Sequence, residues 1–461
     1  MGIAAGLVLA EALRVAGPVG ALAPAAMVIG LVLLRFPAVA LGLLLLSVGV
    51  IESSDPGILP PVESFYDTIG GGLAIPDLIL LAGLGGVLLR FARTGDRPRL
   101  PAPLTTPLLI VVLALLAGAV TGAAAHPGID GKEIFHRSVY VLYLILVPLL
   151  VVNVVRDTRA LRTFAACVAG LAAYKGLSGI YAALGGSGEV VDNQSVSYLG
   201  PLPNLVMLVY LLGVVAALIR RVKLPLWILA SSPLALLALI LSFRRSFWIA
   251  AIFALIIVIV VASQRRGRAA IAVAAVGLAL ALTASLTIGQ SDSSASGSPL
   301  LERAHSLSPT GVESNRGDRY RVDERHNVIA NLEEHPLTGL GVGVPWVVHY
   351  PLAEAHDRRY THVAVLWYWL SFGPIGVIAY VAMMGGALLT AVGVWRRHLD
   401  AGVRIVAIAC FGGVLALLIV ELTATFAGIN PRLSIALGAI LGWLAAAWGD
   451  LPERHRKLAR G

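Results

Sequence analysis

The sequence is poor in charged residues. Asp, Glu, Lys and Arg make up 13% of its 461 residues, against about 25% in soluble proteins. Hydrophobic residues make up 58%, and apolar runs near helix-spanning length recur along most of the chain. A helical run of about 20 residues crosses roughly 30 Å of hydrocarbon. This composition excludes a solvated globular fold, and the fold class we predict is an all-α polytopic membrane protein.

Cysteine is scarce, and patterns typical of metal binding or hydrolysis are absent. The two cysteines, Cys167 and Cys410, both lie in apolar runs, which excludes a disulfide framework. The histidines between residues 326 and 356 match no compact ligand spacing. No nucleophile-elbow pattern is present either. The sequence therefore predicts no metal site and no cofactor.

Lysine and arginine are rare inside the apolar runs and gather in alternate loops. Cytoplasmic loops of membrane proteins are enriched in these residues, so the basic loops predict the cytoplasmic side. This bias accounts for the net charge of +9, and because no domain-sized basic surface is present, a nucleic-acid partner is not expected. The basic segments are 90–99, 156–162, 220–223, 264–268, 395–404 and the tail after 449.

The apolar runs predict about 12 or 13 transmembrane helices. They lie at 17–35, 37–51, 71–90, 104–122, 138–155, 160–184, 200–219, 224–242, 246–263, 269–288, 361–393, 402–427 and 432–448. The chain then divides into an N-terminal transmembrane bundle of about ten helices, a large extracytoplasmic loop with short helices, C-terminal transmembrane helices, and a basic cytoplasmic tail. These four parts span 1–288, 289–360, 361–448 and 449–461.

Two adjacent arginines break the orientation bias. Arg244 and Arg245, in the stretch LSFRRSFW, fall on the predicted extracytoplasmic side. A charge at membrane depth is costly unless it is paired or reaches water. One interpretation is a structural ion pair with an acid of an outer loop, or contact with the interface. The other is an anion site, because guanidinium binds phosphate oxygens in a planar, two-pronged geometry.

The predicted outer loop contains arginine but no lysine, and six of the ten histidines lie from His305 to His362. The segment RYRVDERHNVIANLEEHPLTGLGVG predicts a helix with Arg321, Arg325 and Val328 on one face, followed by a flexible glycine turn. His362 opens the next apolar run. A neutral imidazole there could accept a proton near pH 7; the alternative is a histidine held by hydrogen bonds at the interface.

The run from Arg321 to THVAVLWYWLSFGPIG resembles the signature region of the O-antigen ligase/polymerase (Wzy-type) superfamily. There, an arginine precedes a His-Pro-Leu-x-Gly-x-Gly turn, and a later histidine opens a helix that ends in Gly-x-x-Gly. The matching residues are Arg321, His335, Pro336, Leu337, Gly339, Gly341, His362, Gly373 and Gly376. Upstream, Arg245, the pair Pro203–Asn204, and Asp77 resemble further family positions. The chain departs from the pattern at Val363, Arg325 and Arg244, where Asn, Trp and Ser are usual.

The resemblance implies a metal-independent, GT-C-like glycosyltransferase of polysaccharide biosynthesis in the bacterial cytoplasmic membrane, with its active site on the extracytoplasmic side. Such a ligase or polymerase transfers a glycan from a polyprenyl-diphosphate donor, such as undecaprenyl diphosphate, to a hydroxyl of a lipid or glycan acceptor. By this resemblance His362 is the general base and Arg321 and Arg245 are catalytic. The diphosphate leaving group is bound by Arg244, Arg245, Arg319 and Arg321.

A transporter or permease for an anion or a lipid-linked saccharide is the alternative function. It would use polar groups near the middle of the membrane, and Lys175 and Glu421 are the candidates. Broken helices and an internal repeat, which are common in transporters, are not evident in the sequence.

Overall fold

The computed structural model describes residues 22–51, 58–60, 62–68, 72–125, 128–185, 189–191, 194–196, 200–242, 244–263, 316–352 and 357–451. Regular secondary structure in these ranges is helical, apart from one antiparallel hairpin of β1 (Glu189–Val191) and β2 (Gln194–Val196). The predicted all-α polytopic class is confirmed. The predicted span 269–288 and the domain boundary at 288 lie outside the described residues.

Nine described helices are long and apolar enough to cross a membrane. These are α4 (Ile75–Thr94), α5 (Thr105–Ala125), α6 (Gly131–Val154), α7 (Thr158–Leu184), α8 (Pro201–Ile219), α10 (Arg245–Ser263), α16 (Pro374–Arg397), α17 (Ala401–Val420) and α18 (Pro431–Gly449). The other described helices are α2 (Leu22–Arg35), α3 (Pro37–Val50), α9 (Leu226–Leu241), α14 (Arg316–Glu334), α15 (Ala364–Phe372) and a 3-10 turn at Glu63–Phe65.

Two predicted spans differ from straight helices. The described part of the run at 17–35 forms a pair with the run at 37–51, and Met27–Arg35 and Pro37–Val50 are bent by 115° around Phe36. Pro37 forces this break, because the residue before a proline is driven out of the helical region. The predicted span 361–393 is divided into α15 and α16 at Gly373, whose φ of +68° is outside the helical range.

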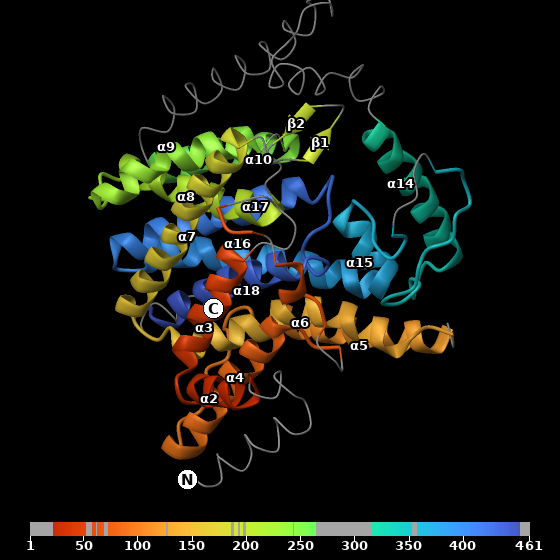
Figure 1. The fold of residues 1–461 in the computed structure, drawn as a ribbon, viewed down its shortest axis with the longest axis horizontal. Helices are drawn as coiled ribbons and strands as arrows, with labels where there is room; N and C mark the ends of the chain where they lie inside the picture. The colour runs from red at the N-terminus through yellow and green to blue at the C-terminus, as the bar shows by residue number, and fades with distance from the viewer. Residues whose placement is uncertain are drawn as a thin grey trace, which may run out of the picture.

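The long helices run side by side and present their loops at two ends (Figure 1). At one end, the Arg90 guanidinium donates to Asn153 O at 2.6 Å, which joins the ends of α4 and α6. Thr158 Oγ1 donates to Asp450 Oδ2 at 2.6 Å and joins α7 to α18. The described parts of the predicted cytoplasmic loops lie here, and we call it the basic end.

The opposite end of the bundle carries α14, drawn in teal at the right of Figure 1, beside α15 and near the hairpin. The chain after α14 packs on α5, where Val342 N donates to Gly118 O at 3.0 Å. We call this the α14 end. The turn between α9 and α10, with Arg244 and Arg245, lies at this end, because α9 starts at the basic end.

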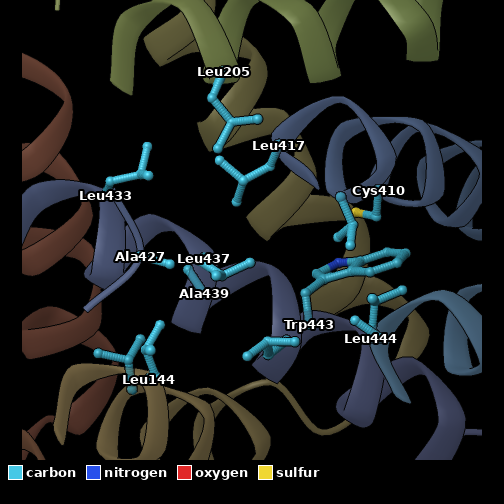
Figure 2. Close-up of a cluster of buried hydrophobic side chains, with 14 of the residues drawn as sticks. Leu144, Leu205, Cys410, Leu417, Ala427, Leu433, Leu437, Ala439, Trp443 and Leu444 are labelled. Atoms are coloured by element: carbon cyan, nitrogen blue, oxygen red, sulfur yellow. The ribbon is translucent and has the colours of Figure 1, made fainter. Parts of the chain in front are cut away.

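The core centres on α18, which packs along α6. Gly438 and Gly442 stand one turn apart, and an added Cβ would lie 2.8 Å from Tyr143 O and 2.9 Å from Pro148 Cα, respectively. Small residues at this spacing allow the two backbones to approach closely. Figure 2 shows the surrounding layer, where the side chains of α18 meet residues of α6, α8 and α17: Leu437, Trp443, Leu444, Leu144, Leu205, Cys410 and Leu417.

Replacing Gly442 with leucine should destabilise the bundle. The new Cβ would lie 2.6 Å from Val151 Cβ, so α18 must move away from α6, and overpacking of this kind costs about 1–3 kcal/mol or more. We expect the thermal midpoint of detergent-solubilised Gly442→Leu to fall by several degrees. Gly385→Leu is the control, since a Cβ at Gly385 meets no atom within 4 Å; equal midpoints for the two variants would contradict the close α6–α18 packing.

Candidate functional site

The helix α14 has a buried inner face and an exposed outer face, and polar residues lie on both. Tyr320, Glu324 and Val328 repeat at a spacing of four residues and are buried, so they form the inner face. Arg321 is half-buried at the edge of this face, whereas Arg319 and Arg325 are exposed. The prediction that Arg325 shares a face with Val328 is therefore wrong, because Val328 is fully buried.

Two asparagines of α14 hold the segment that returns beneath it. Asn327 Oδ1 accepts from the backbone N–H groups of His349 (2.6 Å) and Tyr350 (2.8 Å), and its Nδ2 donates to Tyr350 O (3.0 Å). Asn331 makes a pair of 2.8 Å bonds with the backbone of Val347. Each side-chain amide thus pairs with backbone groups as a neighbouring β-strand would. These bonds hold α14 and residues 347–350 together.

The glycine turn after α14 is tightly packed, unlike the flexible segment predicted. Gly341 has φ +98°, and a Cβ there would lie 2.2 Å from Gly122 N on α5. Leu340 N donates to Leu370 O on α15 at 2.7 Å. The turn is therefore wedged between α5 and α15, and it fixes α14 against the membrane helices.

Glu324 and His362 form the central pair of the site. The Glu324 carboxylate is 1% exposed and accepts hydrogen bonds from His362 N at 2.8 Å and from Thr361 Oγ1 at 3.2 Å. His362 Nδ1 lies 3.0 Å from Glu324 Oε2 and 3.1 Å from Oε1. A buried carboxylate of this kind requires such donors, because an unpaired charge in a protein interior is strongly unfavourable.

This arrangement orients the imidazole for proton acceptance. When His362 is neutral, an N–H on Nδ1 donates to the carboxylate, which leaves the lone pair of Nε2 available. The rings of Tyr320 and Tyr360 lie 5.9 Å and 5.2 Å from the imidazole centroid. His362 keeps 19% of its side chain exposed, so a partner can reach it while the ring is held in place.

The charge of Arg321 acts on the same cluster. Burial and the carboxylates of Glu324 and Asp357 raise the pKa of the Tyr360 phenol, whereas the Arg321 guanidinium lowers it. Arg321 therefore stands close enough to influence a ring in contact with His362. Of the predicted site residues, these two are brought together, while Arg319 lies on the exposed side of α14.

Arg244 and Arg245 lie at the start of α10. The Arg244 carbonyl accepts from Phe247 N and Trp248 N as the first acceptor of the helix, and Trp248 Nε1 donates to Leu239 O at 3.1 Å, which closes the turn from α9. A helix N-terminus is already partly positive, so two arginines there make a strongly cationic point. Among the described residues, the contacts around His362 do not include Arg244 or Arg245.

The segment that precedes His362 is fixed by a network of ion pairs. Arg137 of α6 binds Glu133 at 2.9 Å and Asp357 at 2.7 Å, and Arg359 lies 3.5 Å from Glu133. Trp346 closes this segment from the other side, with its Nε1 donating to the Tyr360 carbonyl at 3.1 Å. The position of His362 is therefore set by α6 and α14 together.

Glu421, one of the two residues considered for a transporter, supports the helix that follows His362. Its Oε2 accepts from Tyr380 Oη at 2.5 Å and its Oε1 from Ala427 N at 2.7 Å. Its backbone carbonyl accepts from Ala364 N, the first residue of α15. These bonds give Glu421 a structural role. Lys175, the other residue considered, is buried on α7.

Two more residues from the sequence pattern stabilise helix starts. Asp77 accepts from Ala74 N at 2.6 Å in a capping box at the start of α4, and it also accepts from Tyr143 Oη. Asn204 Nδ2 donates to Gly200 O at 3.0 Å in the first turn of α8. Over the described part of the chain, no three His, Cys, Asp or Glu residues are grouped to hold a metal ion.

Sequence reasoning missed Glu324. It was one acid among many in a polar loop, and the signal was its position on the inner face, four residues after Tyr320 and four before Val328. Its partner His362 was predicted from its place at the start of an apolar run and from the family resemblance, and neither indicates an acid that binds it.

Residues 230–381 match the family model described as O-antigen ligase. This range contains Arg244, Arg245, Arg321, Glu324 and His362. No curated protein matches the chain.

Replacing Asn327 with alanine should loosen the segment beneath α14. The variant loses three hydrogen bonds to the backbone of His349 and Tyr350, and each net hydrogen bond contributes about 0.5–1.5 kcal/mol. We expect faster hydrogen–deuterium exchange at residues 347–352. His326→Ala, an exposed neighbour on α14, is the control; exchange that is unchanged in Asn327→Ala would mean that the amide does not hold this segment.

Proposed function

We propose that this multi-pass membrane protein, whose residues 230–381 match the O-antigen ligase model, transfers a glycan from a polyprenyl-diphosphate-linked donor to an acceptor hydroxyl. The observation that carries this proposal is the Glu324–His362 pair, which gives an accessible imidazole a fixed orientation at the α14 end.

The reaction is a displacement at the anomeric carbon of the donor sugar. His362 Nε2 takes the proton of the acceptor hydroxyl as its oxygen forms the new glycosidic bond. The bond from the anomeric carbon to the diphosphate oxygen breaks, and its electron pair leaves with the diphosphate. The buried Glu324 carboxylate stabilises the imidazolium that results, because it lies against Nδ1.

Arginines stabilise the leaving group. Negative charge on the diphosphate grows as the bond breaks, so cations already in place stabilise the transition state more than the ground state. Arg321 is half-buried beside the His362 cluster, and Arg245 and Arg244 stand at the positive end of α10. Arg319, exposed two residues before Arg321, assists at the edge of the site.

The orientation of the bundle follows from its charges. The basic end faces the cytoplasm by the bias of loop composition, which turns the α14 end, with His362, to the extracytoplasmic side of a bacterial cytoplasmic membrane. The donor lipid then lies in the outer leaflet, with its diphosphate at the level of the arginines. Glycans are attached to lipid or glycan acceptors on this side, which fits a role in building the cell envelope.

Alanine at His362, Arg321 or Arg245 should abolish glycan transfer without preventing membrane insertion. Loss of a general base removes about 10²–10⁴ in rate, and loss of a charge at the leaving group about 10²–10³. Each variant is expressed in a strain that lacks the native gene, and the glycan product is compared at equal protein levels. Arg325→Ala is the matched control, as this arginine is exposed one turn from Arg321. Wild-type transfer by His362→Ala would rule out the proposed mechanism.

Glu324→Gln tests the orientation of the imidazole. A glutamine oxygen that accepts from His362 N would turn its amide NH₂ toward Nδ1, which favours the tautomer with the proton on Nε2. This tautomer cannot accept the acceptor's proton, so we expect kcat to fall about 10²-fold with KM and the thermal midpoint little changed. A fall in stability that accounts for the lost activity would assign Glu324 a purely structural role.

A further inference from the structure

An open groove of about 660 Å³ lies between α3 and α7, away from the His362 cluster. Its walls are exposed at Gly42, Leu46, Cys167 and Gly170. Most of its lining is apolar, and its charged residues, Asp157 and Arg159, lie at the start of α7. The groove is therefore an apolar channel with a charged mouth at the basic end.

A smaller cavity of about 60 Å³ lies next to the groove, between α3, α7, α8 and α18. Leu45, Phe164 and Leu171 line both. From Arg159 at the mouth to Lys175 in the cavity, α7 rises by about 24 Å, at 1.5 Å per residue. This length exceeds half of the roughly 30 Å hydrocarbon core, which is the depth of one leaflet's chains.

Arginines gather at the basic end next to the groove, where Arg156 stands between the lining residues Val155 and Asp157. The guanidinium groups of Arg90 and Arg156 lie 5.4 Å and 5.7 Å from the centroid of the Phe91 ring. Arg99 donates to the Arg156 carbonyl at 3.3 Å. Burial, together with the charges of Arg90 and Arg99, lowers the pKa of Arg156. An anion bound among these guanidinium groups would offset their mutual repulsion.

The nearby acids neutralise this cluster only in part. Asp157 caps α7 by accepting from Ala160 N at 2.8 Å. Asp96 is the one acid of the 90–99 loop, which carries four arginines. A positive excess therefore remains at the basic end, next to the mouth of the groove.

We propose that the groove binds an anionic phospholipid of the leaflet at the basic end. One acyl chain lies between α3 and α7, and the phosphate is held by Arg156 and Arg159. A phospholipid fits because its chain and its phosphate match an apolar groove that opens at a cationic mouth, and basic pockets between helices on this side of a membrane recognise anionic headgroups. The site is separate from glycan transfer, which we place at the other end of the bundle.

Two glycines offer a way to fill the groove without disturbing the helices. A Cβ built on Gly42 of α3 or Gly170 of α7 meets no atom within 4 Å. Gly42→Leu and Gly170→Leu therefore place bulk in the channel from opposite walls. Gly385→Leu adds the same bulk to open space on α16, outside the groove.

The test is native mass spectrometry of the full-length protein with equal amounts of phosphatidylglycerol and phosphatidylcholine that have identical chains. We expect the wild type and Gly385→Leu to retain one phosphatidylglycerol with about a tenfold preference. Gly42→Leu and Gly170→Leu should lose it, and Arg156→Gln with Arg159→Gln should bring the two lipids to equal retention. Equal retention by the wild type, no retained lipid, or unchanged retention in both glycine variants would overturn the proposal.

Cys167 provides a second measurement that does not require any variant to fold. It is exposed in the groove, whereas Cys410 is buried, so maleimide modification of the native protein reports on Cys167. Phosphatidylglycerol should slow the modification several-fold, and phosphatidylcholine should slow it less. Equal rates with and without phosphatidylglycerol would show that the lipid does not occupy the groove.

Discussion

A buried carboxylate joins the two parts of the α14 end. Glu324, on a helix outside the membrane bundle, accepts hydrogen bonds from Thr361 Oγ1 and from the backbone N–H and Nδ1 of His362, and these two residues lead into α15. Removing a charge from water is costly, so this carboxylate is stable only when all of these donors are in place. The position of α14 and the orientation of the His362 imidazole therefore depend on each other.

The surrounding contacts each hold one side of this pair. Asn327 and Asn331 bind the returning segment to α14, and the packed glycine turn fixes α14 against α5 and α15. On the other side, the Glu421 carbonyl accepts from the first residue of α15. The loop helix is therefore attached to the membrane helices at several points, although its outer face is polar. Such rigidity suits a site that must hold a proton acceptor at a fixed place beside a large lipid-linked substrate.

Much of the fold could be predicted from the sequence, because apolar length reports directly on burial in a membrane. The basic loops also predicted which helix ends lie on the same side of the membrane. The ends of α4 and α6, at Arg90 and Asn153, lie together as this prediction requires. Bends were harder to predict. The break at Phe36 falls between the two predicted runs at 17–35 and 37–51, but the bend of 115° there was not predicted. The break at Gly373 interrupts a run whose hydropathy is continuous, so only the glycine's backbone freedom marks it. Glu324 was not predicted, since its spacing with Tyr320 and Val328 is a weak signal in a loop that contains many acids.

The length of α9 has a consequence for the lipid around the protein. Its 16 residues rise about 24 Å, which is less than the roughly 30 Å hydrocarbon core. A short span thins the adjacent bilayer, and headgroups then approach the depth at which α9 ends. Arg244 and Arg245 follow that end directly. Thinning of this kind would reduce the dehydration of both guanidinium groups and would bring lipid phosphates nearer to them.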